Sequence, residues 1–81
     1  MAHQELEDCI EACDVCADAC DHCATACLQE ADVTAMADCI RLDIDCAQIC
    51  RLAAGMMARD SEFVRQICLV CANICDACAE E

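Results

Sequence analysis

The cysteines of this chain follow one another in steps of three and four residues over long stretches. Thirteen of its 81 residues are cysteine, in three runs: Cys9, Cys13, Cys16, Cys20, Cys23 and Cys27; Cys39, Cys46 and Cys50; Cys68, Cys71, Cys75 and Cys78. Such steps place side chains on one face of an α-helix. The thiols therefore occupy the positions that leucine holds in a helical bundle, and they predict an all-α fold with a cysteine-lined core.

These runs predict three long helices in a single domain, residues 1–81. The chain has no proline and one glycine, so each helix can continue through its whole run. We expect the helices over residues 2–28 and 33–58 and from about Ser61 to Ala79. Connections of a few residues make consecutive helices antiparallel neighbours. The expected architecture is an antiparallel helical bundle.

The two breaks between the helices carry residues that cap helix N-termini. Asp32 ends the first break, and Asp60 and Ser61 lie in the second. Side-chain oxygens of Asp and Ser accept hydrogen bonds from the free amides of a first helical turn. Asp32 is therefore predicted to cap the second helix, and Asp60 or Ser61 the third.

Antiparallel helices place the sulfurs in layers along the bundle axis. The expected layers are Cys9 and Cys13 with Cys50, Cys68 and Cys71; Cys16 with Cys46 and Cys75; and Cys20 and Cys23 with Cys39 and Cys78. Met57 and Phe63 are expected to close the lower end, with Cys27 and Met36 at the upper end. The sulfurs then form one column.

The second and third helices carry more apolar surface than one seam can bury. The side chains in excess are Ile40, Ile44, Ile49, Leu52, Ile67, Leu69, Val70 and Ile74. Exposed apolar faces of this extent mark contact surfaces. A further helix or another subunit is therefore expected to complete the bundle, and the chain is predicted to be a homo-oligomer.

The charge of the chain excludes some partners. Seventeen acids against four arginines, with no lysine, give a net charge of -13. This surface repels nucleic acid and anionic membranes, keeps the chain soluble and attracts cations. The first eight residues are acidic and polar, without the features of an export signal. A cytoplasmic location is therefore predicted, where thiols stay reduced.

Three interpretations of the cysteines compete. Cysteines three or four apart on a helix have Cβ atoms about 5–6 Å apart, which is too far for an unstrained disulfide. Cysteine can also act as a small buried apolar residue, but leucine or alanine would pack as well without the risk of oxidation. A metal site of thiolates explains the number and the spacing together, so it is the interpretation that we favour.

Charge balance favours Cu(I) as the metal. A Cu⁺ ion that replaces one thiol proton leaves the charge of the core unchanged. A Zn²⁺ ion held by four thiolates leaves about two negative charges in an apolar interior, which is costly. Soft thiolates also select Cu(I). An iron–sulfur or other thiolate-cluster protein, such as an electron carrier, is the alternative, because it also uses Cys-x2-Cys runs.

Methionine, histidine and aspartate add further candidates. Met36 is expected beside the last cysteine layer and is included as a metal ligand, because its thioether sulfur is soft. His22 lies away from the sulfur stripe and is predicted to be on the surface. Asp43 lies near the cysteine seam of the second helix, where it either flanks the core or pairs with Arg41. No catalytic set is visible, and no enzymatic activity is predicted.

Three segments of the chain resemble a known family. The runs CIEACDVCADACDHCATAC, CIRLDIDCAQIC and SEFVRQICLVCANICDACAEE are similar to those of the cysteine-rich four-helix-bundle copper storage proteins. That resemblance implies an all-α bundle that binds and stores many Cu(I) ions through cysteine thiolates. It also implies that all thirteen cysteines point inward and can bind, and that the protein is a homo-oligomer.

The chain departs from that family at its end. Family bundles have four long helices, and in many members a further segment with cysteine and histidine follows the counterpart of Cys75 and Cys78. This sequence ends at Glu81. Three explanations stay open: a naturally short chain, a truncated one, or a fourth wall that another chain supplies.

Overall fold

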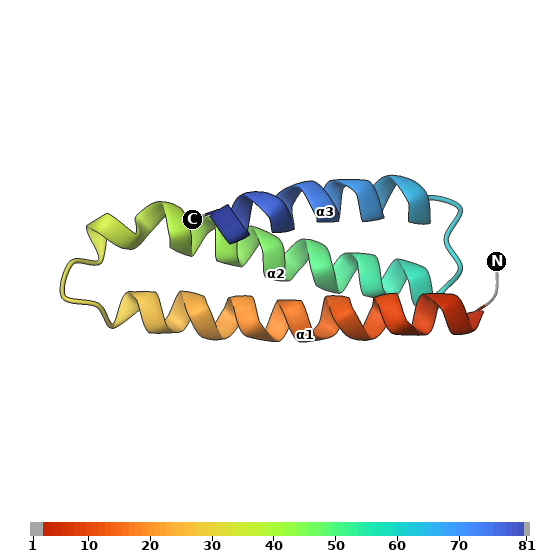
Figure 1. The fold of residues 1–81 in the computed structure, drawn as a ribbon, viewed down its shortest axis with the longest axis horizontal. Helices are drawn as coiled ribbons and strands as arrows, with labels where there is room; N and C mark the ends of the chain where they lie inside the picture. The colour runs from red at the N-terminus through yellow and green to blue at the C-terminus, as the bar shows by residue number, and fades with distance from the viewer. Residues whose placement is uncertain (1–2, 81) are drawn as a thin grey trace.

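The chain folds into three α-helices, each antiparallel to the next along the chain, so that α1 and α3 run in the same direction (Figure 1). The structure, a computed structural model, describes the backbone of residues 3–80 and the side chains of residues 6–80. The helices are α1 (His3–Leu28), α2 (Ala37–Ala58) and α3 (Val64–Glu80), with a short 3-10 helix, η1 (Thr34–Met36), ahead of α2. The all-α prediction is confirmed, whereas the predicted helix start at Ala2 lies outside the described residues.

Asp32 accepts a hydrogen bond in the turn between α1 and α2 but does not cap α2 as predicted, because the N-cap residue of α2 is Met36, without a side-chain hydrogen bond. Asp32 Oδ1 accepts a hydrogen bond from the Ala35 amide at 3.2 Å. The chain then forms η1, where the Met36 amide donates to the Val33 carbonyl at 3.0 Å, in the i to i+3 spacing of a 3-10 turn. Because of this tighter turn, α2 begins at Ala37 and not at the predicted Val33.

A Schellman motif ends α2. The Asp60 amide donates to the Met57 carbonyl at 3.1 Å, and the Ser61 amide donates to the Met56 carbonyl at 3.0 Å. Asp60 has a φ of 52°. This left-handed conformation is required by the motif, and aspartate tolerates it better than most residues do. Asp60 therefore closes α2 and does not cap α3.

Ser61 is the residue that caps α3. Its Oγ accepts a hydrogen bond from the Phe63 amide at 3.1 Å, and its carbonyl accepts one from the Val64 amide at 3.2 Å. The prediction that Phe63 closes the lower end of the core is wrong, because its side chain is 54% exposed. Phe63 lies in the capping turn, ahead of the first residue of α3, and so misses the helical positions that face the core.

The core of the molecule follows α2, which packs against both other helices, whereas α1 and α3 approach each other far less closely. Small side chains allow this packing, since Ala17 of α1 and Ala47 and Ala53 of α2 are almost inaccessible to solvent. Met57 is buried in the same core, as predicted. The result is a slender rod of 47 × 18 × 16 Å with one thin, continuous interior.

Arg51 joins α2 to α1 across the surface of the rod. One of its guanidinium nitrogens donates to Asp18 at 3.0 Å, and another lies 2.8 Å from Asp21. The two carboxylates are three residues apart on α1, so they share one face and a single arginine reaches both. This ion pair helps to set the alignment of α1 along α2.

Large apolar side chains stay exposed on α2 and α3. Ile44 and Leu52 of α2 and Leu69 and Val70 of α3 are between 43% and 65% exposed. Part of the apolar excess that the sequence predicts on these helices is therefore present, whereas Ile49, Ile67 and Ile74 are partly buried against the core. No helix within residues 3–80 is long and apolar enough to cross a membrane.

Candidate metal centre

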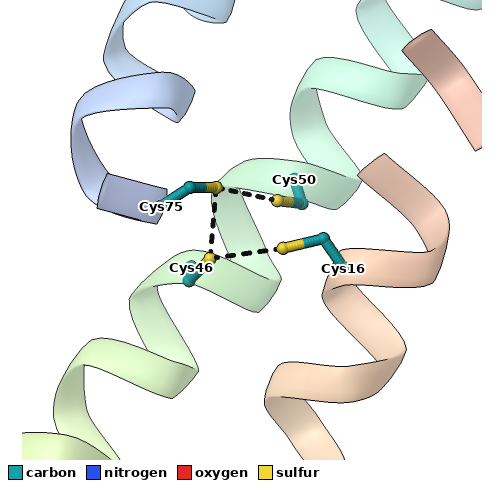
Figure 2. A group of neighbouring side chains, drawn as sticks. All are labelled: Cys16, Cys46, Cys50 and Cys75. Atoms are coloured by element: carbon teal, nitrogen blue, oxygen red, sulfur yellow. Dashed lines mark hydrogen bonds between the residues drawn. The ribbon is translucent and has the colours of Figure 1, made fainter. Parts of the chain in front are cut away.

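Four cysteines from all three helices meet in the middle of the bundle, and we call them the central group (Figure 2). Cys16 comes from α1, Cys46 and Cys50 from α2, and Cys75 from α3. The sulfur of Cys46 lies 3.8 Å from that of Cys16 and 3.3 Å from that of Cys75. The predicted layer of Cys16, Cys46 and Cys75 is confirmed. Cys50 joins it because it lies one helical turn after Cys46.

The sulfurs continue from the central group towards the turn between α2 and α3. The Sγ atoms of Cys13, Cys50 and Cys71 lie within 4.8 Å of one another. Beyond them, Cys9 and Cys68 line a cavity of about 270 Å³ between α1 and α3. Cys9 is nevertheless exposed, and so is Cys23 farther along α1, so the implied inward placement does not bury every thiol. At Cys9 the reason is that α1 and α3 contact each other far less than either helix contacts α2.

A third group lies on the opposite side of the central group. Its sulfurs, all within 4.8 Å of one another, are those of Cys20, Cys46 and Cys78. The predicted layer of Cys20 and Cys23 with Cys39 and Cys78 is therefore present as two groups and not as one. Asp43 of α2 connects the two groups, because it accepts hydrogen bonds from both Cys39 and Cys78.

The fourth group lies beside the turn between α1 and α2, and we call it the hairpin-end group. Its members are Cys23 and Cys27 of α1 and Cys39 and Asp43 of α2, with ligand atoms within 4.8 Å of one another. Each helix contributes two side chains four residues apart, which share one helix face. The sulfurs of Cys27 and Cys39 are 3.9 Å apart. Cys23 is exposed, so this group opens to solvent.

Asp43 is a buried carboxylate within the column of thiols. Its side chain is 3% exposed. Its Oδ1 accepts a hydrogen bond from the Cys78 thiol at 3.1 Å, and its Oδ2 accepts one from the Cys39 thiol at 3.7 Å. Arg41 pairs with Asp38 instead, at 2.8 Å. Of the two interpretations left open by the sequence, the place beside the core is therefore correct.

Shared residues link the four groups into one column. We call Cys13, Cys50 and Cys71 the Cys13 group, and Cys20, Cys46 and Cys78 the Cys20 group. Cys50 belongs to both the Cys13 group and the central group, and Cys46 belongs to both the central group and the Cys20 group. The hydrogen bond from Cys78 to Asp43 then joins the Cys20 group to the hairpin-end group. A soft ion held at one level therefore has sulfur ligands of the next level within reach.

Burial makes several of these thiols harder to deprotonate than an ordinary thiol. Desolvation, followed by neighbouring thiols, raises the pKa of Cys46 and of Cys50 far above the ordinary value of 9.0. Burial likewise raises the pKa of Cys71 and of Cys78 to about 12. Burial also acts to raise the pKa of Cys75, but hydrogen bonds with neighbouring thiols outweigh it and lower that pKa. A metal ion must therefore displace protons in order to bind.

The remaining candidates lie outside these four groups. All thirteen cysteines are free thiols, without a disulfide among them. Met36 is partly buried at the end of η1, directly before α2. His22 is exposed on α1, as predicted.

Asp43 is the one member of the four groups that the sequence did not assign as a ligand. Its signal was its spacing of four from Cys39 and three from Cys46, which continues the cysteine pattern.

Comparison with known proteins agrees with this geometry. Residues 2–81 match the sequence profile of a family described as "Copper storage protein". The chain belongs to the copper storage protein family. An uncharacterised cysteine-rich protein of Bacillus subtilis strain 168, YhjQ, is 51% identical over 78 residues, which span 96% of this chain and 72% of that protein.

A solved member of the family shares the fold. The structure titled "Cu(I)-bound Copper Storage Protein BsCsp3" is 53% identical and superposes with a TM-score of 0.84. The match covers 89% of this chain and 68% of that chain. The antiparallel arrangement of the three helices is therefore that of a known copper storage protein.

Proposed function

We propose that this chain binds and stores several Cu(I) ions along its sulfur column. The observation that carries this proposal is the continuity of the column, in which Cys46 and Cys50 each serve two groups. The proposed ligands are the thirteen cysteines and Met36, which are Cys9, Cys13, Cys16, Cys20, Cys23, Cys27, Cys39, Cys46, Cys50, Cys68, Cys71, Cys75, Cys78 and Met36. Family membership supports the same function.

The interior of the bundle suits a monovalent soft ion. Cys46 and Cys50 are 1% and 0% exposed, so a charge left there would lie in an apolar medium. A Cu⁺ ion that replaces one thiol proton adds no net charge, and thiolates bind Cu(I) well at low coordination number. Sulfurs between 3.3 and 3.9 Å apart can bridge neighbouring Cu⁺ ions. Many ions can therefore enter without a growing cost of charge burial.

The same distances argue against the iron–sulfur alternative. In an iron–sulfur cluster the iron and sulfide atoms lie between the protein ligands, so the ligand sulfurs must be far enough apart to enclose them. Here the sulfurs of Cys46 and Cys75 are in direct contact, at 3.3 Å. Cys46 and Cys50 also serve two groups each, whereas every cluster requires its own set of thiolates.

The proposed role is sequestration and not catalysis, in the cytoplasm. The raised pKa of buried thiols such as Cys46 and Cys50 makes them poor nucleophiles. They are well suited to hold an ion that water and oxidants must not reach. A reducing compartment would keep all thirteen thiols free for copper.

We also propose that the chain works as a homo-oligomer. Leu69 and Val70 on α3 and Leu52 on α2 are about half exposed or more, which favours burial against another subunit. Light scattering of the reduced protein should give a mass of at least two chains, each of 8.7 kDa. A mass equal to that of one chain, at all concentrations tested, would contradict the oligomer.

Anaerobic titration of the reduced protein with Cu(I), against a chromophoric Cu(I) chelator, tests the storage function. Uptake on the order of ten ions per chain is expected from the number of soft ligands. The loaded protein should be colourless, because Cu(I) has a filled d shell. Saturation at one or two ions would contradict storage, and a brown protein with acid-labile sulfide would favour the iron–sulfur alternative.

A further inference from the structure

The hairpin-end group differs from the rest of the column in its chemistry. Three of its ligand atoms are the sulfurs of Cys23, Cys27 and Cys39, and the fourth is a carboxylate oxygen of Asp43. Carboxylate oxygen is a hard donor that Cu(I) binds poorly, whereas Zn²⁺ takes sulfur and oxygen ligands together. We propose that the copper-free protein binds one Zn²⁺-class divalent ion per chain here, through these three thiolates and Asp43. This site goes beyond the storage of Cu(I) and does not depend on it.

The distances within the group fit tetrahedral coordination. Zn–S bonds of about 2.3 Å give tetrahedral edges of about 3.8 Å between sulfurs, and edges to oxygen are slightly shorter. The sulfurs of Cys27 and Cys39 are 3.9 Å apart, and Cys39 Sγ lies 3.7 Å from Asp43 Oδ2. A divalent ion can therefore enter with small movements of side chains.

The carboxylate already has the orientation of a metal ligand. Its Oδ2 faces Cys39 of the group, while its Oδ1 accepts a hydrogen bond from Cys78 of α3 at 3.1 Å. A hydrogen bond to the second oxygen of a ligating carboxylate is a common support of metal sites. Because Asp43 is 3% exposed, packing restricts it to this orientation.

The change in charge on binding Zn²⁺ is smaller at this site than in the central group. A Zn²⁺ ion that displaces four thiol protons changes the charge of the central group by about two units, in an apolar interior. In the hairpin-end group three thiols are present in place of four, so one thiol proton fewer must leave and the charge of the site changes less. Cys23 is also exposed, so water can solvate that charge. The Cys13 and Cys20 groups offer three sulfurs each, one fewer than a closed zinc site uses.

The test uses the full chain, reduced and free of metal, with Co²⁺ as a spectroscopic probe and Zn²⁺ as its competitor. We expect one Co²⁺ per chain, with the intense visible bands of a tetrahedral ion and sulfur-to-cobalt charge transfer in the ultraviolet. One equivalent of Zn²⁺ should abolish these bands. Failure to bind Co²⁺ and Zn²⁺, or tight binding of several ions per chain, would overturn the proposal.

Two variants locate the ion, and a third is the matched control. Asp43→Asn keeps the shape of the side chain and removes its charge, so Zn²⁺ affinity should fall by at least about tenfold. Cys23→Ala, at an exposed position that is safe for folding, should have a similar effect and weaken the cobalt charge-transfer band. Asp45→Asn, at an exposed acid of the same helix, should leave Zn²⁺ affinity within about twofold of the parent.

Unchanged Zn²⁺ affinity in both Asp43→Asn and Cys23→Ala would overturn the proposal. So would its loss in Cys16→Ala together with retention in Cys23→Ala, since the ion would then lie in the central group. Cu(I) uptake of the parent protein is measured separately. Its failure would refute copper storage and leave the zinc site to be judged on the results above.

Discussion

The central group and the hairpin-end group use the same helical spacing but offer an ion different surroundings. The central group has four sulfurs from three helices, and its Cys46 and Cys50 are almost inaccessible. The hairpin-end group has three sulfurs and one carboxylate from two helices, and its Cys23 is exposed. One aspartate in a cysteine seam thus changes which ion the bundle suits, without any change in the helix that carries it.

Removal of the shared sulfurs should break the central group with the largest effect. In Cys46→Ala/Cys50→Ala, three of the four groups lose at least one ligand. Cu(I) uptake should therefore fall by about half, which is more than two independent thiols would account for. Anaerobic chelator titration measures this loss. A decrease of two ions per chain or fewer would show that the groups act independently.

High pH should destabilise the copper-free protein through the buried thiols. Their folded-state pKa values, about 12 for Cys71 and Cys78, lie above the unfolded value of 9.0. Their contribution to stability is therefore complete below pH 9 and is lost as the pH rises towards 12. Each such thiol should cost about 1.4 kcal/mol per pH unit in this window. Urea unfolding at a series of pH values measures the slope.

Two comparisons check the origin of this pH dependence. Cys71→Ala should flatten the slope, because one raised pKa is removed. The copper-loaded protein should lose little stability over the same window, since its thiolates hold copper in place of protons. An equal slope in all three samples would assign the effect to groups other than the core thiols.

Asp43→Cys should make the hairpin end resemble the central group. The site would then offer four sulfurs, so the charge-transfer intensity of its Co²⁺ complex should rise by about one third. Absorption spectra at one equivalent of Co²⁺ measure this change, with the parent protein as the reference. Unchanged intensity would mean that residue 43 does not contact the ion.

Arg51→Ala should have the smallest effect of the four changes. Arg51 links α2 to Asp18 and Asp21 of α1, whereas Arg41, nearer the hairpin end, pairs with Asp38 of its own helix. We expect a small loss of stability for Arg51→Ala and a smaller one for Arg41→Ala at low salt, with both losses reduced at high salt. Urea unfolding measures both, and equal losses would refute a special role for the link between helices.

The helices and most of the sulfur layers could be predicted because periodicity alone sets them. Cysteines at steps of three and four specify a helix face, and antiparallel packing then brings Cys16, Cys46 and Cys75 together. The boundaries were harder. The 3-10 turn at Thr34–Met36 and the capping turn before Val64 depend on local hydrogen bonds that the periodicity does not encode.

The role of Asp43 could not be settled from the sequence, because two rules conflict there. Its spacing places it in the cysteine seam, whereas the cost of burying a charge places an aspartate at the surface. In the structure Asp43 lies in the cysteine seam, where the thiols of Cys39 and Cys78, from different helices, donate hydrogen bonds to its carboxylate. The exposure of Cys9 was missed for another reason, since it depends on the distance between α1 and α3 and not on either helix alone.

The slender shape of the molecule determines how the metal capacity of such a protein can increase. Its cross-section of 18 × 16 Å is fixed by the width of packed helices, and its ligands are arranged along the remaining dimension. Capacity therefore scales with helix length, since each added turn of about 5.4 Å brings about one more sulfur per helix. A longer chain with the same repeat would hold more metal at constant thickness, with every ion as close to the surface as it is here.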